Sequence, residues 1–177
     1  MKLYQKLCAA ALLTGSSLVN AGVITETGTI DTSTDVDYFS FTMDSASTVT
    51  IDVWAKGYNG SNLDSYIYLY QPDVNGAYVT SNDDDWNAAA MTDGTTHGFD
   101  SYISHYLAAG DYTLAIGAFF LSDANARDGV NENGYTSGDY QITFTGTGLA
   151  TAVSEPGSIA LFGLGLVGLG FARRRQS

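Results

Sequence analysis

Apolar and polar residues alternate with a period of two through most of the middle of the chain. Phe39, Phe41 and Met43 alternate with serine and threonine, and the segment 48–53 repeats the pattern with valine and isoleucine against threonine and aspartate. Such alternation is typical of strands that have one face in the core. The pattern predicts strands at 23–30, 39–43, 49–53, 64–70, 78–81, 101–107, 112–119 and 140–145.

Turn-forming residues separate these segments. The stretch 72–76 supplies a proline and an Asn-Gly pair, and 109–111 supplies a glycine reversal. No segment between the strands carries the period of an amphipathic helix, and 121–138 is predicted to be one long loop. We therefore predict an all-β fold, an antiparallel β-sandwich of about seven or eight strands over 22–152. Its inward-pointing residues are predicted to include Phe39, Phe41, Val49, Ile51, Val53, Leu114, Ile116 and Ile142.

The N-terminal segment has the features of a secretory signal peptide over residues 1–21. Lys2 and Lys6 form a basic region, 7–13 is an apolar stretch, and a small-residue cleavage site ends at Ala21. We expect the secretion machinery and signal peptidase to act on it. The single cysteine, Cys8, lies inside this segment, so the mature chain is expected to have neither disulfides nor thiolate metal ligands.

The charge of the predicted sandwich is strongly acidic. Between residues 22 and 152 the only bases are Lys56 and Arg127, against 18 of the chain's 19 acids, which gives a net charge of −16. Nucleic acid, phosphate ligands and anionic membrane surfaces all require clustered bases, so the composition argues against them as partners of the body. Cations are the natural counterpart.

The last 25 residues break the pattern. After 153–157, the segment 158–171 is almost wholly apolar, and Arg173, Arg174 and Arg175 follow it. This segment is short for a membrane span, but arginines can extend their reach to the interface. The arginines are expected to hold the C-terminus in the cytoplasm and leave the sandwich outside. The tail, 153–177, is thus predicted to contain a membrane helix at 158–172.

The order of motif, apolar helix and arginine cluster resembles the PEP-CTERM sorting signal of Gram-negative bacteria. The motif is Val153, Ser154, Glu155 and Pro156, with serine where the family usually has proline. The resemblance implies cleavage near the motif by exosortase, a membrane protease. It also implies transient anchoring in the inner membrane, followed by a location at the cell surface or outside the cell. A plain tail anchor is the alternative.

Four short segments of the body also resemble the bacterial pre-peptidase C-terminal β-sandwich family. They are 35–41, 69–73 together with Gly76, 81–85 and 107–112. The resemblance implies a non-catalytic domain of the kind attached to secreted enzymes, some of which bind calcium or polysaccharide.

An acidic run is the clearest candidate for metal binding. Asp83, Asp84 and Asp85 follow Asn82 directly, and calcium accepts six to eight oxygen ligands. The EF-hand template fails here, because Ala88 and Gly94 occupy its glycine and final glutamate positions. A calcium site would therefore combine this run with other loops, to which Asp35, Asp37 or Asp64 could contribute. The alternative is a solvated acidic loop.

Aromatic residues suggest a second kind of site. Tyr66, Tyr68 and Tyr70 alternate with Ile67 and Leu69, so they share one face of a strand. With Trp86 they form a candidate surface for stacking on polysaccharide. The alternative is that the tyrosines pack beneath a loop or another strand.

The sequence offers little for catalysis. His97 and His105 are the only histidines, and no hydrolase, zinc or phosphate-loop motif is present. We therefore expect a non-enzymatic protein, a structural or adhesive component of the cell envelope or its exopolysaccharide. The alternatives are a calcium-stabilised polysaccharide-binding module and a small hydrolase that uses paired carboxylates.

Overall fold

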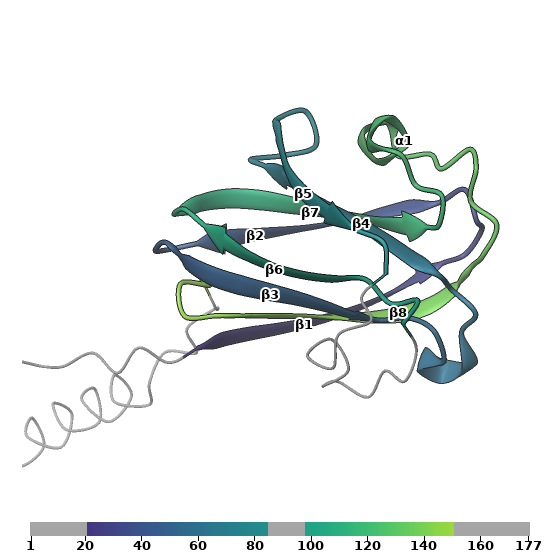
Figure 1. Ribbon diagram of the computed structural model, residues 1–177, viewed down its shortest axis with the longest axis horizontal. Helices are drawn as coiled ribbons and strands as arrows, with labels where there is room; N and C mark the ends of the chain where they lie inside the picture. Colours follow the sequence, from purple (N-terminus) through teal and green to yellow (C-terminus); the bar gives the residue numbers. More distant parts are fainter. Residues whose placement is uncertain (1–20, 85–97, 151–177) are drawn as a thin grey trace, which may run out of the picture.

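The computed structural model describes residues 21–84 and 98–150, which form a sandwich of two antiparallel sheets (Figure 1). The predicted fold class and the eight predicted strands are confirmed. The strands are β1 (Gly22–Ile30), β2 (Val36–Met43), β3 (Ser47–Trp54), β4 (Ser65–Gln71), β5 (Ala77–Asn82), β6 (Tyr102–Leu107), β7 (Gly110–Ala118) and β8 (Gly138–Gly146). A 3₁₀ turn, η1 (Tyr58–Gly60), and a short helix, α1 (Asp123–Asp128), lie in the connections.

The strand order is that of a hairpin rolled into two layers. One sheet has the order β1-β8-β3-β6 and the other β2-β7-β4-β5. The first strand therefore pairs with the last, the second with the seventh, the third with the sixth and the fourth with the fifth. This is the jelly-roll arrangement of eight antiparallel strands.

The core fills the space between the two sheets, as the alternation predicts. Val49, Ile51 and Val53 of β3 are fully buried, as are Leu114 and Ile116 of β7. Phe41 stacks on Tyr112 at 5.6 Å between ring centroids and lies 5.1 Å from Phe144 of the facing sheet. Phe39 is half-buried and packs against the edge of the core. The predicted inward-pointing set is confirmed with Phe39 at its margin.

The two ends of the sandwich differ in their connections. At one end, called the terminal end, Gly22 pairs with Gly146, and the Ala150 amide donates to the Thr42 carbonyl at 2.9 Å. The connections there are short: 44–46, 72–76 and 108–109. At the opposite end, called the loop end, lie the connections 31–35, 55–64 and 119–137 together with residues 83–84 and 98–101. The connections 55–64 and 119–137 are longer than any at the terminal end. The nine residues of β1 separate the two ends by about 30 Å, at ~3.3 Å per residue.

The prediction of one unstructured loop over 121–138 is wrong in part, because the segment contains α1. The Ser122 hydroxyl caps the helix by accepting from the Asn125 amide at 3.2 Å. Gly129 ends it in the left-handed conformation, with φ 78°. A serine cap and a terminal glycine were visible in the sequence, but six residues are too few to show a helical period.

Several predicted features lie outside the described residues. They are residues 1–20 of the signal peptide, the motif at 153–156, the membrane helix at 158–172 and the arginines at 173–175. Within 21–84 and 98–150, no helix has the length and apolar character needed to span a membrane.

The packing generates a prediction from two valines of the same sheet. Val53 is fully buried, whereas Val23 is 56% exposed. We expect Val53→Ala to lower the free energy of unfolding by about 2 kcal/mol, because it removes buried methyl groups and leaves a cavity. The matched change Val23→Ala is expected to cost less than about 0.5 kcal/mol. Urea unfolding measures both, and equal losses would contradict the predicted core.

Candidate functional site

The tyrosines of β4 do not form an exposed stripe. Tyr68 and Tyr70 are buried, and Tyr66 is half-buried. The Tyr68 hydroxyl donates to the Leu121 carbonyl at 3.1 Å, and the Tyr70 hydroxyl donates to the Asp123 carboxylate at 2.9 Å. The rings are covered by the chain around α1, so they are not available for stacking on a polysaccharide. The alternative of tyrosines packed beneath a loop is the one observed.

Arg127 of α1 holds this cover in place. Its guanidinium lies 4.4 Å from the centre of the Tyr70 ring and forms an ion pair with Asp123 at 3.1 Å. It also donates to the carbonyls of Val74 and Gly76 in the β4–β5 turn, at 2.6 and 3.0 Å. The arginine thereby ties helix, strand and turn together, which is a structural role.

Asp35 and Asp37 have structural partners and do not join the acidic run. The Thr32 amide and hydroxyl donate to the Asp35 carboxylate at 2.8 and 2.9 Å. The Asp37 carboxylate accepts from the hydroxyl of Tyr140 at 2.6 Å. Neither aspartate belongs to the group of carboxylates that could hold a metal ion among the described residues. The expectation that they contribute calcium ligands is therefore not supported.

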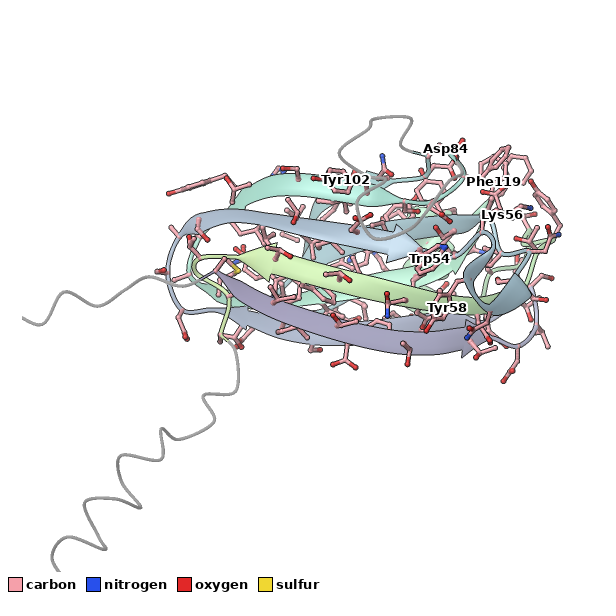
Figure 2. The ribbon with its side chains drawn as sticks, turned by 90° about the horizontal axis from the view of Figure 1, so that it is seen from below. Trp54, Lys56, Tyr58, Asp84, Tyr102 and Phe119 are labelled. Carbon is pink, nitrogen blue, oxygen red and sulfur yellow. The ribbon has the colours of Figure 1, made fainter. Side chains whose placement is uncertain are left out.

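Three carboxylates do come together at the loop end. One carboxylate oxygen from each of Asp64, Asp83 and Asp84 lies within 4.8 Å of the other two. We call this group the acidic cluster. Figure 2 shows Asp84 at the same end of the sandwich as Trp54, Lys56, Tyr58 and Phe119. Asp85 and Trp86, which the sequence also suggested as site residues, lie outside the described residues.

Buried serines position the acidic run beside Asp64. The hydroxyls of Ser65 and Ser101 lie 3.0 Å apart, and Ser101 donates to the Asp83 carbonyl at 2.9 Å. The Asn82 side chain accepts from the amide of Tyr102 at 2.8 Å. The end of β5 is therefore fixed to the start of β6, next to the residue that precedes β4.

The connection 119–137 fixes Asp64 from the other side. The Asp64 amide donates to the Thr136 hydroxyl at 3.1 Å, and its carbonyl accepts from the Phe119 amide at 2.9 Å. The Tyr135 hydroxyl donates to the Asp64 carboxylate at 3.5 Å. Tertiary contacts between three connections thus create the acidic cluster.

Burial and mutual repulsion disfavour the charged form of the acidic cluster. Burial, followed by the carboxylates of Asp84 and Asp64, raises the pKa of Asp83 to about 7. Burial also raises the pKa of Asp84, and burial with the Asp84 charge raises that of Asp64. The Oδ1 atoms of Asp83 and Asp84 are buried without a hydrogen-bond partner among the described residues. Carboxylate oxygens are the kind of ligand that a hard cation such as calcium takes.

An exposed aromatic group flanks the acidic cluster. The rings of Phe119 and Phe120 lie 4.0 Å apart, and Tyr135 lies 6.0 Å from each. Phe120 is 57% exposed and Tyr135 is 59% exposed. These three residues carry no signal in the sequence, because an aromatic residue in an aperiodic stretch gives no indication of its surroundings.

The acidic cluster generates a prediction for protein kept in chelator. Because the pKa of Asp83 rises from its ordinary 3.8 to about 7 on folding, its protonated form favours the folded state. That contribution is full below about pH 4 and is lost as the pH rises through about 7. Between about pH 5 and pH 8, we expect the wild type to lose more unfolding free energy than Asp83→Asn, as measured by urea unfolding. Asp44→Asn, at the terminal end, should keep the wild-type profile, and parallel curves for all three proteins would contradict the raised pKa.

Comparisons with known proteins bear on the tail and on the fold. The family model of the PEP-CTERM protein-sorting motif matches residues 152–176. The body is similar to the pre-peptidase C-terminal domain of a Bacillus anthracis collagenase, with 16% identity over 68% of this chain and 87% of that chain, and a TM-score of 0.44. It is also similar to PliG, a periplasmic inhibitor of g-type lysozyme from Aeromonas hydrophila, with 12% identity over 71% and 85% of the two chains and a TM-score of 0.39.

A search of curated proteins gave no match. Both structural similarities concern the fold alone. The predicted sorting tail is confirmed, and the predicted resemblance of the body to a pre-peptidase C-terminal domain is found in the structure comparison. The motif indicates processing by exosortase, so the chain is an exported protein sorted at its C-terminus.

Proposed function

We propose that this protein is a non-enzymatic, structural or adhesive component of the cell envelope or its exopolysaccharide. In this proposal a signal peptide directs export, and exosortase cuts near Glu155 and Pro156 after the tail has anchored the chain in the inner membrane. The sandwich then reaches the cell surface or the outside. The observation that carries the proposal is the match of residues 152–176 to the PEP-CTERM protein-sorting motif.

The arrangement of the sandwich supports this topology. Residue 150 lies at the terminal end, beside the end of β2, so the chain leaves the body there. The loop end, with the longer connections, is at the opposite end of the strands. A chain held by its tail would therefore present the loop end away from the membrane, where contacts with other envelope components are made.

The acidic cluster differs from the carboxylate pair that the alternative of a small hydrolase requires. Oxygens of the acidic cluster approach within 4.8 Å of one another. Retaining glycosidases separate their two carboxyl groups by roughly 5–5.5 Å and inverting enzymes by roughly 6.5–9.5 Å. The acidic cluster instead brings three carboxylates together, and a cation among them would offset their mutual repulsion.

Calcium binding is a second candidate function, favoured by the donor set of the acidic cluster. Asp64, Asp83 and Asp84 would supply carboxylate oxygens from two connections, and the unpartnered Oδ1 atoms of Asp83 and Asp84 fit such a ligand. Calcium would neutralise part of the −16 charge of a body that has no cysteine to form a disulfide. It would thus stabilise the loop end of the exported protein.

The proposed sorting is tested by changing the motif. We expect Glu155→Ala with Pro156→Ala to leave a full-length precursor in the membrane fraction, because exosortase would no longer recognise the tail. Mass spectrometry of the C-terminus, with fractionation of the cells, measures this. Glu132→Ala, an exposed glutamate of the body, is the matched control and should be processed as the wild type is. A mature wild-type protein that still ends at Ser177 would refute processing.

The calcium candidate is tested by comparing calcium with magnesium at equal ionic strength. A cation that binds only the folded state stabilises it by ~2.7 kcal/mol at a hundredfold excess over the dissociation constant. We expect calcium to raise the melting temperature by roughly 5–10 °C and magnesium by much less, since magnesium demands octahedral geometry and dehydrates reluctantly.

Two variants separate site binding from charge screening. Asp83→Asn with Asp84→Asn should abolish the difference between the two ions, whereas Asp44→Asn at the terminal end should preserve it. Equal melting shifts from calcium and magnesium in the wild type would leave only a solvated acidic loop.

A further inference from the structure

A polar hollow lies at the loop end, where the outer face of the first sheet meets η1. Its volume is about 280 Å³, and it is lined by Thr27, Gly28, Thr29, Tyr58, Asn59 and Asp139. The threonines come from β1, the aspartate from β8 and the tyrosine and asparagine from η1. The exposed side chains of Thr27, Thr29 and Asn59 leave the hollow open to solvent.

Local backbone features bring η1 onto the sheet at this point. The buried Asp100 carboxylate accepts from the amides of Ala55 and Lys56 at 3.0 and 2.7 Å, which fixes the chain as it leaves β3. At the start of β8, a Cβ on Gly138 would lie 2.2 Å from the Ser61 hydroxyl oxygen. Only glycine lets the connection 55–64 lie this close to β8, beside Asp139.

The polar groups of the hollow are held before any ligand arrives. The Thr29 hydroxyl donates to Asp139 Oδ1 at 2.8 Å, and Asn59 Nδ2 donates to Asp139 Oδ2 at 3.4 Å. Asn59 adopts the left-handed conformation, with φ 50°, which asparagine tolerates better than most residues. A carboxylate offers about four acceptor positions, so Asp139 keeps capacity for hydroxyl groups of a ligand.

An aromatic ring supplies the apolar part of the hollow. Tyr58 is half-buried, and its ring meets Trp54 edge to face, with centroids 5.2 Å apart. Trp54 lies on the outer face of β3, where it pairs with Gln141 of β8. The tryptophan therefore fixes the tyrosine ring at the wall of the hollow (Figure 2).

The groups that line the hollow indicate which kind of ligand it would bind. Among the residues that the structure describes, no lysine or arginine lines the hollow, and Asp139 repels anions, so a phosphate or an acidic sugar is disfavoured. The polar lining argues against an apolar ligand. Hydroxyls, an amide, one carboxylate and one ring match a molecule with hydroxyl groups at its edge and C–H groups on its face. A neutral sugar ring has this character, and the volume suits one such unit.

We propose that this hollow is a binding subsite for one sugar unit of a neutral polysaccharide. The proposal rests on the proposed function as a component of the envelope or exopolysaccharide. It adds to that function a class of ligand, neutral polysaccharide, and a binding site. The site lies on the sheet opposite to Tyr66, Tyr68 and Tyr70, which the sequence suggested and which are covered. On β1 and β8 the outer face continues from the hollow with uncharged side chains, because Thr25 pairs with Thr143 and Val23 with Thr145, while the next strand places the buried Asp52 beside Thr143. That face leaves room for neighbouring units of the same polysaccharide.

The test measures binding of four neutral probes to the full chain purified in detergent: cellohexaose, maltohexaose, mannohexaose and N-acetylchitohexaose. We expect at least one to bind in isothermal titration. Tyr58→Ala should weaken that binding about tenfold through the loss of the ring, and Tyr78→Ala, an exposed tyrosine of the other sheet, should not change it.

A second pair of variants tests the polar wall with little risk to the fold. Thr27→Val removes one hydroxyl and keeps the shape of a strand residue, so it should weaken binding about three- to tenfold. Thr80→Val, on β5 of the other sheet, is its matched control and should bind as the wild type does. If Tyr58→Ala proves misfolded by circular dichroism, Thr27→Val and Asp139→Asn decide the outcome.

Two results would overturn the subsite. One is that none of the four probes binds, and the other is that a bound probe is unaffected by the variants of the hollow. Polygalacturonate that binds more tightly than every neutral probe would also contradict the proposed ligand class. Sorting is measured separately by the mass of the C-terminus, so a chain that is cleaved but binds no probe would remove the subsite and leave the sorting proposal standing.

Discussion

The pairing of the first strand with the last is the constraint on which the rest of the structure depends. Over nine residue pairs, from Gly22–Gly146 to Ile30–Gly138, β1 and β8 close the rolled hairpin. This pairing places the body's two chain ends at one end of the sandwich and the longer connections at the other. The described body therefore begins, at residue 21, and ends, at residue 150, on the same side of the fold. In the proposed function, this arrangement leaves the loop end for contacts with other molecules.

At the loop end, hydrogen bonds of buried serine side chains hold acids close together against their mutual repulsion. Ser65 and Ser101 are fully buried and fix the end of β5, so Asp83 lies beside Asp64. The same contacts reduce the solvation of the carboxylates, which is why burial is the first cause of their raised pKa values. The proposed calcium site and the proposed sugar subsite lie at the same end but use different residues. Their ligands can therefore be tested independently.

The outer face of the second sheet is partly covered by the chain, whereas that of the first sheet is open along β1. On the second sheet, the chain around α1 covers Tyr68 and Tyr70, and Arg127 anchors that cover to the β4–β5 turn. On the first sheet, β1 carries threonines at 25, 27 and 29, and β8 carries them at 143 and 145, so this face has hydroxyl groups and few charges. The tyrosines of β4, which the sequence suggested as a binding surface, stabilise the fold. Tyr58 and Asp139, which no sequence pattern indicated, line the hollow.

The sequence by itself determined the sorting motif, the eight strands and most of the core. These features depend on local order: a motif, an apolar segment and an arginine cluster in succession, or alternation along one strand. Tertiary structure decided which strands are neighbours, and therefore which of the many acids meet. Asp64 joins Asp83 and Asp84, whereas Asp35 and Asp37 are engaged by Thr32 and Tyr140. Alternation places Tyr66, Tyr68 and Tyr70 on one face but does not show what covers it. The physical reason is that burial and proximity arise from long-range contacts between connections, which no local pattern in the chain records.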